Sequence, residues 1–261
     1  MRLGVSNLGW QREEDAELVA ELGGMGVQAL EVAPTKLWDE PLAVPPETLA
    51  AYRVRAGVAI VAVQALLFGR PELRLFGGSR DATLAHLRGM CDLAAGLGAQ
   101  VLVFGSPGNR RRDGLARDEA FDRAATFFRE LGAYAAGRGV CVCVEPLPPQ
   151  LGTDFVTTAA EAAELVRAVA SPGFGLHLDS SSLHLAGEDP LEAIGPGLRH
   201  FHASEVGYGV LGTTGVEHGR CAEALRRSGY RGVVSIEVLA GQDGNRDRVL
   251  ASLEHARQAY G

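Results

Sequence analysis

An eightfold alternation of short apolar segments and helical patterns constrains the fold most strongly. The strand-like segments occupy residues 2–6, 27–32, 58–65, 100–104, 140–145, 173–179, 198–203 and 232–238. Amphipathic stretches lie between them, at 12–22, 82–97, 118–136, 158–169, 217–228 and 246–259, with weaker helical patterns near 46–55 and 190–194. Strands that are apolar on both faces are typical of a parallel sheet covered on both sides. Eight β-then-α units in series predict one (β/α)8 TIM barrel, an α/β fold with a closed eight-stranded parallel sheet.

The length and composition agree with a single barrel domain spanning residues 1–261. The chain of 261 residues is close to the roughly 250 that such a barrel needs. A net charge of −7 gives no electrostatic footprint for nucleic acid. The start MRLGVSNLGW is too short and polar for a signal peptide, and no apolar stretch is long enough to cross a membrane. The four cysteines lack zinc-ribbon spacing, so we expect reduced thiols in a cytoplasmic protein.

Four strand-like segments in the second half end on or next to a potential metal ligand. VCVCVE ends at Glu145, FGLHLD at Asp179 and VVSIE at Glu237, while LRHFHAS carries His202. The carboxyl ends of barrel strands meet at one mouth, so these side chains are expected to converge. Three carboxylates and one imidazole form an oxygen-rich set that suits one divalent ion, Mn²⁺, Mg²⁺ or Co²⁺, with Zn²⁺ as a further alternative.

Strand parity predicts a polar layer beneath this cluster. Alternate residues of a strand face opposite sides, so the interior below the ligands would hold Cys141, Cys143, His177, His200 and Ser235. Buried polar groups need partners. One interpretation is that these groups orient the ligands. The interpretation that we favour for the two histidines is that they are hydrogen-bonded core residues without a catalytic part.

Further polar residues follow the strands at the predicted mouth. We expect substrate contacts from Asn7, Glu31, Lys36, Gln64, Asn109, Arg110 and Glu205. Lys36 is the sole lysine, and its ammonium could bind a phosphate together with Arg110 or polarise a carbonyl. The alternative for residues 110–112 is an ordinary solvated loop, and Glu205 could equally be an exposed loop residue.

Several motifs resemble one known superfamily. VEP, HLDSS, HFHASE and SIEV look like the metal-binding strand ends of the xylose isomerase-like barrels, the sugar-phosphate isomerases and epimerases. EVAPTKLW, VFGSPGNR and GTDFVTTAAEA extend the resemblance over most of the chain. It implies a divalent metal held by Glu145, Asp179, His202 and Glu237, with the two glutamates also moving protons. The implied reaction is isomerisation or epimerisation of a sugar or sugar phosphate through a metal-stabilised enediolate.

Two positions depart from the pattern of the epimerases. Many of these have Asp-x-x-His on the sixth strand, where this chain has Ser182, and some have an arginine where this chain has Tyr208. His184 is offset by two residues from the expected histidine. We expect Ser182 and Tyr208 to contact the substrate, and the exchanges leave the identity of that substrate open.

Other functions remain alternatives at this point. An abasic-site nuclease of the endonuclease IV type shares the barrel, but it needs a histidine-rich trinuclear zinc cluster, and the chain has seven histidines in all. A related lyase or dehydratase would also pass through a metal-stabilised enediolate. A non-catalytic ligand-binding barrel would have lost this catalytic activity. The metal and the formation of a homo-oligomer are likewise open.

Overall fold

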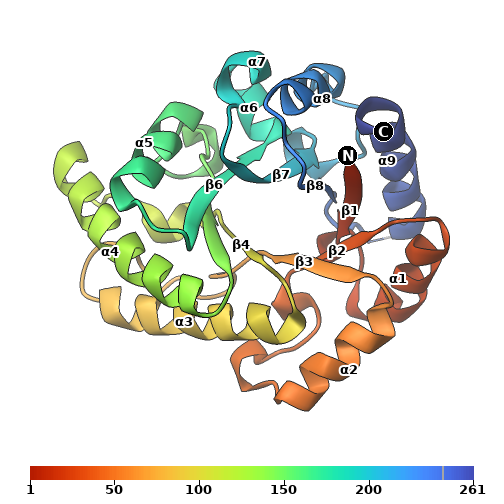
Figure 1. Ribbon diagram of the computed structural model, residues 1–261, viewed down its shortest axis with the longest axis horizontal. Coiled ribbons are helices and arrows are strands. Elements are labelled where there is room, and N and C mark those ends of the chain that lie inside the picture. Colours follow the sequence, from red (N-terminus) through yellow and green to blue (C-terminus); the bar gives the residue numbers. More distant parts are fainter. Residues whose placement is uncertain (243) are drawn as a thin grey trace.

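The computed structural model describes residues 1–242 and 244–261, and its centre is a closed parallel barrel (Figure 1). Each strand pairs with the next in the chain, and β1 pairs with β8 to close the barrel. The predicted TIM barrel is therefore confirmed. The strands are β1 (Arg2–Ser6), β2 (Ala29–Val32), β3 (Ala59–Val63), β4 (Val101–Phe104), β5 (Cys141–Val144), β6 (Phe174–Asp179), β7 (Leu198–Ser204) and β8 (Val233–Glu237).

Helices form a ring around the barrel in Figure 1. They are α1 (Asp15–Gly24), α2 (Pro46–Ala56), α3 (Arg80–Leu97), α4 (Arg117–Gly137), α5 (Ala159–Val169), α6 (Ser180–Ala186), α7 (Pro190–Ala193), α8 (His218–Arg227) and α9 (Asn245–Tyr260). The weaker helical patterns of the sequence correspond to α2 and α7. The two ends of the chain lie together, and the Met1 amino group is 3.5 Å from the carbonyl oxygen of Tyr260.

Helix α6 is the element that the sequence patterns did not predict. Its sequence begins with three serines, which favour caps and turns over helix interiors. The Asp179 side chain, however, accepts a hydrogen bond from the Ser182 amide at 2.8 Å and so caps the first turn. Gly187, with φ of +67°, ends the helix in a left-handed conformation that glycine adopts without strain. The sixth connection therefore contains two short helices.

Alternation along β7 separates an apolar outer layer from a polar interior. The Phe201 ring packs 6.2 Å from the ring of Tyr260 on α9, between barrel and helices. Its neighbours His200 and His202 instead contact His177 of β6 inside the barrel. The predicted parity of these two strands is therefore confirmed, and the interior beneath the mouth is polar.

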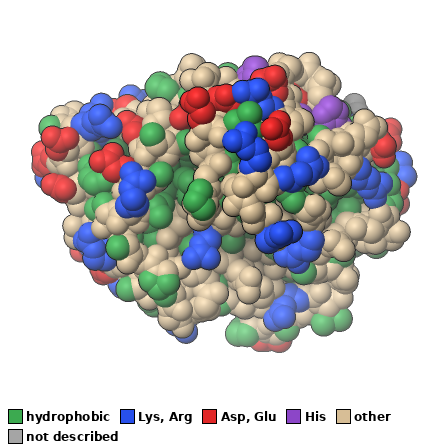
Figure 2. Space-filling model, turned by 45° about the horizontal axis from the view of Figure 1, so that its top comes forward, with side chains coloured by type: hydrophobic (Ala, Val, Ile, Leu, Met, Phe, Trp, Pro, Cys, Tyr) green, Lys and Arg blue, Asp and Glu red, His purple; other side chains and the backbone are tan. Residues whose placement is uncertain are grey.

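The outer surface of the described chain mixes both signs of charge. Figure 2 shows acidic and basic side chains interspersed over one face, without an extended stripe of a single sign. Among the described residues, no helix combines the length and the apolar character that crossing a membrane requires. The four cysteines, Cys91, Cys141, Cys143 and Cys221, are all free, as expected, and all are buried.

Candidate metal and substrate site

The four predicted metal ligands meet at the carboxyl ends of β5 to β8. Glu145 follows β5 directly, Asp179 ends β6, His202 lies in β7 and Glu237 ends β8. One ligand atom each from Glu145, Asp179 and His202 lie within 4.8 Å of one another. Glu237 Oε2 is 3.4 Å from His202 Nδ1. All four side chains are buried, so the fold gathers one imidazole and three carboxylates in a place that water reaches poorly.

His202 has the arrangement expected of a metal ligand. Its Nε2 is 3.0 Å from both carboxylate oxygens of Glu31, so this nitrogen donates its proton there. The Nδ1 atom is buried and has no hydrogen-bond partner among the described residues. A histidine that gives one N–H to a carboxylate and keeps its other nitrogen free is the usual form of a metal-bound imidazole. The residues present thus fit a divalent ion at this cluster.

Asp179 is fixed by three hydrogen bonds. The hydroxyl of Ser204 donates to Oδ2 at 2.6 Å, while the hydroxyl of Ser181 and the amide of Ser182 donate to Oδ1 at 2.7 and 2.8 Å. Ser181 and Ser204 are site residues that the sequence reasoning missed. The available signal was their closeness in sequence to two ligands, in the segments DSSS and HFHAS.

The carboxylate of Glu145 is held tightly against the end of β4. A Cβ atom added to Gly105 would lie 2.5 Å from Glu145 Oε2, so a side chain there would displace this carboxylate. Burial, reinforced by the charge of Asp179, raises the pKa of Glu145 to about 8, although His202 opposes the shift. A carboxyl group with a pKa near neutrality can both take and return a proton at physiological pH.

The remaining electrostatics favour a positive charge at the centre of the cluster. Burial raises the pKa of Glu237 even though His202 opposes it. Burial alone would lower the pKa of His202, but Glu31 and Glu237 outweigh it and raise that pKa well above its usual value. The surrounding carboxylates therefore stabilise either an imidazolium or a bound cation.

A cavity of about 610 Å³ opens above the cluster, and both Glu145 and Glu237 line it. Its walls are largely apolar, and two of its lining side chains, Phe68 and Leu239, are 71% and 41% exposed. The one basic side chain among its described lining residues is Arg70, which pairs with Glu72 at 2.7 Å. The further apolar lining residues are Leu8, Ala65, Leu67, Pro71, Val103, Pro107, Leu147 and Leu151.

Three of the predicted substrate contacts line this cavity: Gln64, Asn109 and Tyr208. The Asn109 amide nitrogen donates to the carbonyl oxygens of Arg70 and Leu73, so it also joins two of the loops that form the mouth. Burial, together with the charge of Glu237, raises the pKa of Tyr208. Its neutral hydroxyl can donate a hydrogen bond to a ligand.

The other predicted substrate contacts do not line the cavity, and the structure differs from expectation at these positions: Asn7, Glu31, Lys36, Arg110, Ser182 and Glu205. Asn7 is fully buried and accepts a hydrogen bond from the Ala33 amide. Glu31 is fully buried between two histidines. Ser182 is 4% exposed within the first turn of α6.

The predicted phosphate pair of Lys36 and Arg110 is wrong. The Arg110 guanidinium is fully buried and donates to the carbonyl oxygens of Glu145 and Val156 at 2.6 and 3.3 Å. It fixes the backbone at Glu145 and has no face toward solvent. The Lys36 ammonium donates instead to the side-chain oxygen of Gln11 at 3.2 Å.

Glu205 organises the loop after β7. Its carboxylate accepts hydrogen bonds from the amides of Gly212 and Thr214 at 2.6 and 2.9 Å and lies 3.0 Å from Nε2 of His218. The Tyr208 amide donates to the carbonyl oxygen of the same glutamate at 2.8 Å. Glu205 thus holds the segment that carries Tyr208 over the cavity.

Replacing Glu205 by alanine is expected to loosen this loop. Each lost charge-assisted hydrogen bond contributes about 1.5–3 kcal/mol, so amide exchange at Gly212 and Thr214 should accelerate by at least tenfold. Hydrogen exchange followed by mass spectrometry measures this, with Glu217→Ala, an exposed residue of the same loop region, as the matched control. Equal exchange in the two variants would show that Glu205 does not hold the loop.

The fold and this cluster define the chain as a closed parallel barrel with a candidate metal site at its mouth, and sequence comparison names the family. Residues 16–259 match the xylose isomerase-like TIM barrel family. The chain therefore belongs to this family, as the motifs predicted. No curated protein sequence matches it.

Solved structures with the same fold include two epimerases. A D-psicose 3-epimerase in the presence of D-fructose has a TM-score of 0.82 at 18% identity, with both chains covered completely. A 3-keto-D-glucoside 4-epimerase from E. coli has a TM-score of 0.82 at 17% identity over 99% of each chain. The IolI protein with a zinc atom has a TM-score of 0.78 at 18% identity over 100% of this chain and 98% of that one. These similarities establish the shared fold.

Proposed function

We propose that the protein is a divalent-metal-dependent isomerase or epimerase that moves a carbon-bound proton next to a carbonyl group of a sugar. The observation that carries the proposal is that Glu145 and Glu237 belong to the ligand cluster and also line the same cavity. The epimerases among the similar structures support it.

The residues have three roles in this proposal. A divalent ion held by the cluster would polarise the substrate carbonyl and stabilise the negative charge that develops on it. Glu145 and Glu237 enter the cavity from different strands, so one can remove a proton and the other can return one. Asp179 and His202, each fixed by hydrogen bonds, keep the cluster in place. The hydroxyl of Tyr208 binds a substrate hydroxyl where some epimerases have an arginine.

The cavity favours an uncharged sugar over a sugar phosphate. Its one described basic side chain, Arg70, is already paired with Glu72, and Arg110 is buried away from it. A phosphate would meet no free cation there, whereas apolar walls suit the C–H faces of a sugar or an apolar substituent. The same lack of free basic groups disfavours an abasic-site nuclease, whose substrate carries phosphates.

Exchange of substrate hydrogen with solvent deuterium tests the proposal. The protein loaded with Mn²⁺ or Co²⁺ is incubated in D₂O with free ketoses, keto-glycosides and the matching phosphates, and carbon-bound deuterium is measured by NMR. We expect exchange next to the carbonyl of at least one uncharged substrate. No sugar phosphate should exchange faster than the matching uncharged sugar. Absence of exchange over the whole panel would contradict the proposal.

The choice of metal, a homo-oligomeric state and a cytoplasmic location remain predictions.

A further inference from the structure

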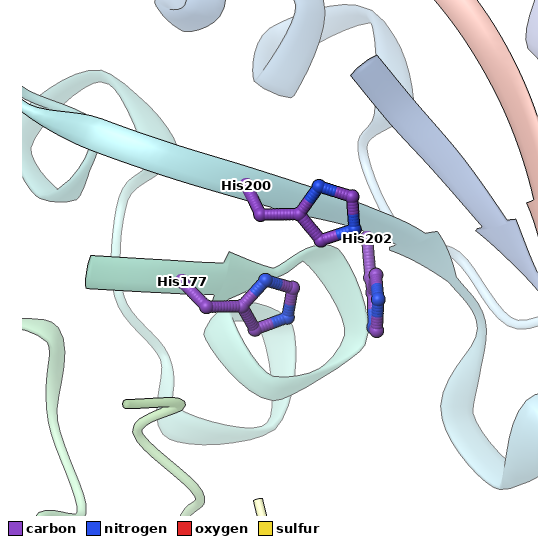
Figure 3. Close-up of side chains that lie close together, drawn as sticks. All are labelled: His177, His200 and His202. Carbon is purple, nitrogen blue, oxygen red and sulfur yellow. The ribbon is translucent and has the colours of Figure 1, made fainter. Parts of the chain in front are cut away.

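Three buried histidines lie together at the base of the proposed metal cluster, and one of them, His202, belongs to that cluster. The side chains of His177 (β6) and His200 (β7) extend side by side toward the ring of His202 (β7) (Figure 3). Their ring centroids are 5.4, 4.1 and 5.2 Å apart, and one nitrogen of each lies within 4.8 Å of the others. Three imidazoles on one tetrahedral ion, with metal–nitrogen bonds of about 2.0–2.1 Å, place their centroids roughly 5 Å apart.

His177 contradicts the interpretation of these histidines as satisfied core residues. His200 Nε2 lies 2.9 Å from Glu31 Oε2, as that interpretation predicts. His177, in contrast, is fully buried, and neither of its ring nitrogens has a hydrogen-bond partner among the described residues. The hydroxyl of Ser235, opposite His202 in the strand register, is also buried and has no partner in the described part of the chain. Each such group costs about 1–3 kcal/mol unless something binds it.

A carboxylate completes the set. Glu31 of β2 is fully buried, and its oxygens lie within 3.0 Å of Nε2 of both His200 and His202. Three imidazoles and one carboxylate form a ligand set typical of Zn²⁺, Co²⁺ and other transition metals. The upper cluster is different in kind, because it offers three carboxylates and one imidazole.

We propose that His177, His200 and Glu31, together with the Nε2 atom of His202, form a second divalent-cation site directly beneath the first. His202 then borders both sites, because its Nδ1 faces the upper cluster and its Nε2 faces Glu31. A neutral imidazole has one free lone pair, so binding both ions through His202 releases its ring proton to solvent. This site does not depend on which reaction the upper cluster performs.

The charge of the interior agrees with a second cation. Four buried carboxylates lie at or below the mouth, and the buried guanidinium near them is that of Arg110. Burial lowers the pKa of Arg110 to about 10, so it remains positive at neutral pH. With the four carboxylates ionised, as metal binding requires, one dication and this guanidinium leave the interior with one net negative charge. A second dication, together with release of the His202 ring proton, brings the net charge to zero. The four carboxylates are Glu31, Glu145, Asp179 and Glu237.

Zinc stoichiometry tests the second site. Wild-type protein, His177→Leu and Asp179→Asn are dialysed against Zn²⁺ and their bound metal is measured by mass spectrometry. We expect two ions per wild-type chain and one in each variant, with histidine scattering in the zinc absorption spectrum weaker in His177→Leu than in Asp179→Asn. One ion in wild type and one in His177→Leu would overturn the proposal. In that case His177→Leu would only stabilise the metal-free protein, because it removes two unpaired buried nitrogens.

Diffraction from wild-type crystals grown with Zn²⁺ gives an answer that does not depend on a variant folding. Two anomalous peaks, the lower one bonded to His177 and His200, are expected. A single peak at the upper cluster, with a water molecule hydrogen-bonded to His177, would overturn the second site while leaving the proposed function intact. Two peaks in a protein that exchanges no substrate hydrogen with deuterium would contradict the proposed function while leaving the second site intact.

Discussion

Replacing Glu237 by glutamine is expected to lower kcat by about 10²–10⁴-fold, the range that a general acid or base contributes. The amide keeps the shape of the side chain and an oxygen for the metal, but it can neither take nor return a proton. The side chain lies 3.4 Å from His202 and lines the cavity, so the loss falls on proton transfer rather than on folding. Steady-state rates of epimerisation with metal-saturated protein measure it.

Deuterium exchange distinguishes the roles of Glu145 and Glu237 more clearly than kcat does. If Glu237 serves one face of the substrate, Glu237→Gln should still exchange deuterium from one epimer through Glu145 while forming no product. Glu145→Gln should show the same behaviour from the other epimer. Glu223→Gln, an exposed acid on α8, is the matched control. A Glu237→Gln variant that retains its metal and a rate within threefold of wild type would remove Glu237 from the mechanism.

The sequence could predict where the ligands lie because the carboxyl ends of all strands in a parallel barrel meet at one mouth. Any residue at the carboxyl end of a parallel strand reaches the same mouth. The positions of Glu145, Asp179 and Glu237 could therefore be predicted without knowing which residues they contact. Strand parity likewise placed His200 beneath His202. Periodicity and parity are local properties of the chain, so they can be used before any tertiary partner is known.

How deep a polar side chain lies in the barrel, and which residue it pairs with, could not be predicted in the same way. Glu31 was expected at the mouth, but it lies inside β2, where it meets histidines 169 and 171 residues away in the chain. Arg110 was expected to contact the substrate at the mouth, but two carbonyl oxygens hold it in the interior. Both errors have one cause, because a polar residue near a strand end can be turned inward whenever a distant partner satisfies it. That partner is a property of the tertiary structure.

Replacing Glu31 by alanine is expected to lower the free energy of unfolding by about 3–5 kcal/mol, as when one partner of a buried ion pair is removed. The carboxylate is fully buried and lies against both His200 and His202. Burial would raise the pKa of Glu31, but the two histidines outweigh it and hold that pKa well below its usual value, so the group is ionised in the folded protein. Urea denaturation at neutral pH, with metal removed by chelator, measures the loss.

The same substitution should weaken metal binding at the upper cluster, although Glu31 does not reach it. Without the carboxylate, Nε2 of His202 loses the partner that sets its tautomer and orients its ring, and such losses typically cost about 10–100-fold in affinity. Titration calorimetry with Mn²⁺, which suits the oxygen-rich upper cluster better than the histidines below, measures this effect. Glu31→Gln, which keeps one acceptor for the histidines, should lie between wild type and alanine in both measurements. Wild-type stability together with wild-type Mn²⁺ affinity in Glu31→Ala would show that Glu31 does not support His202.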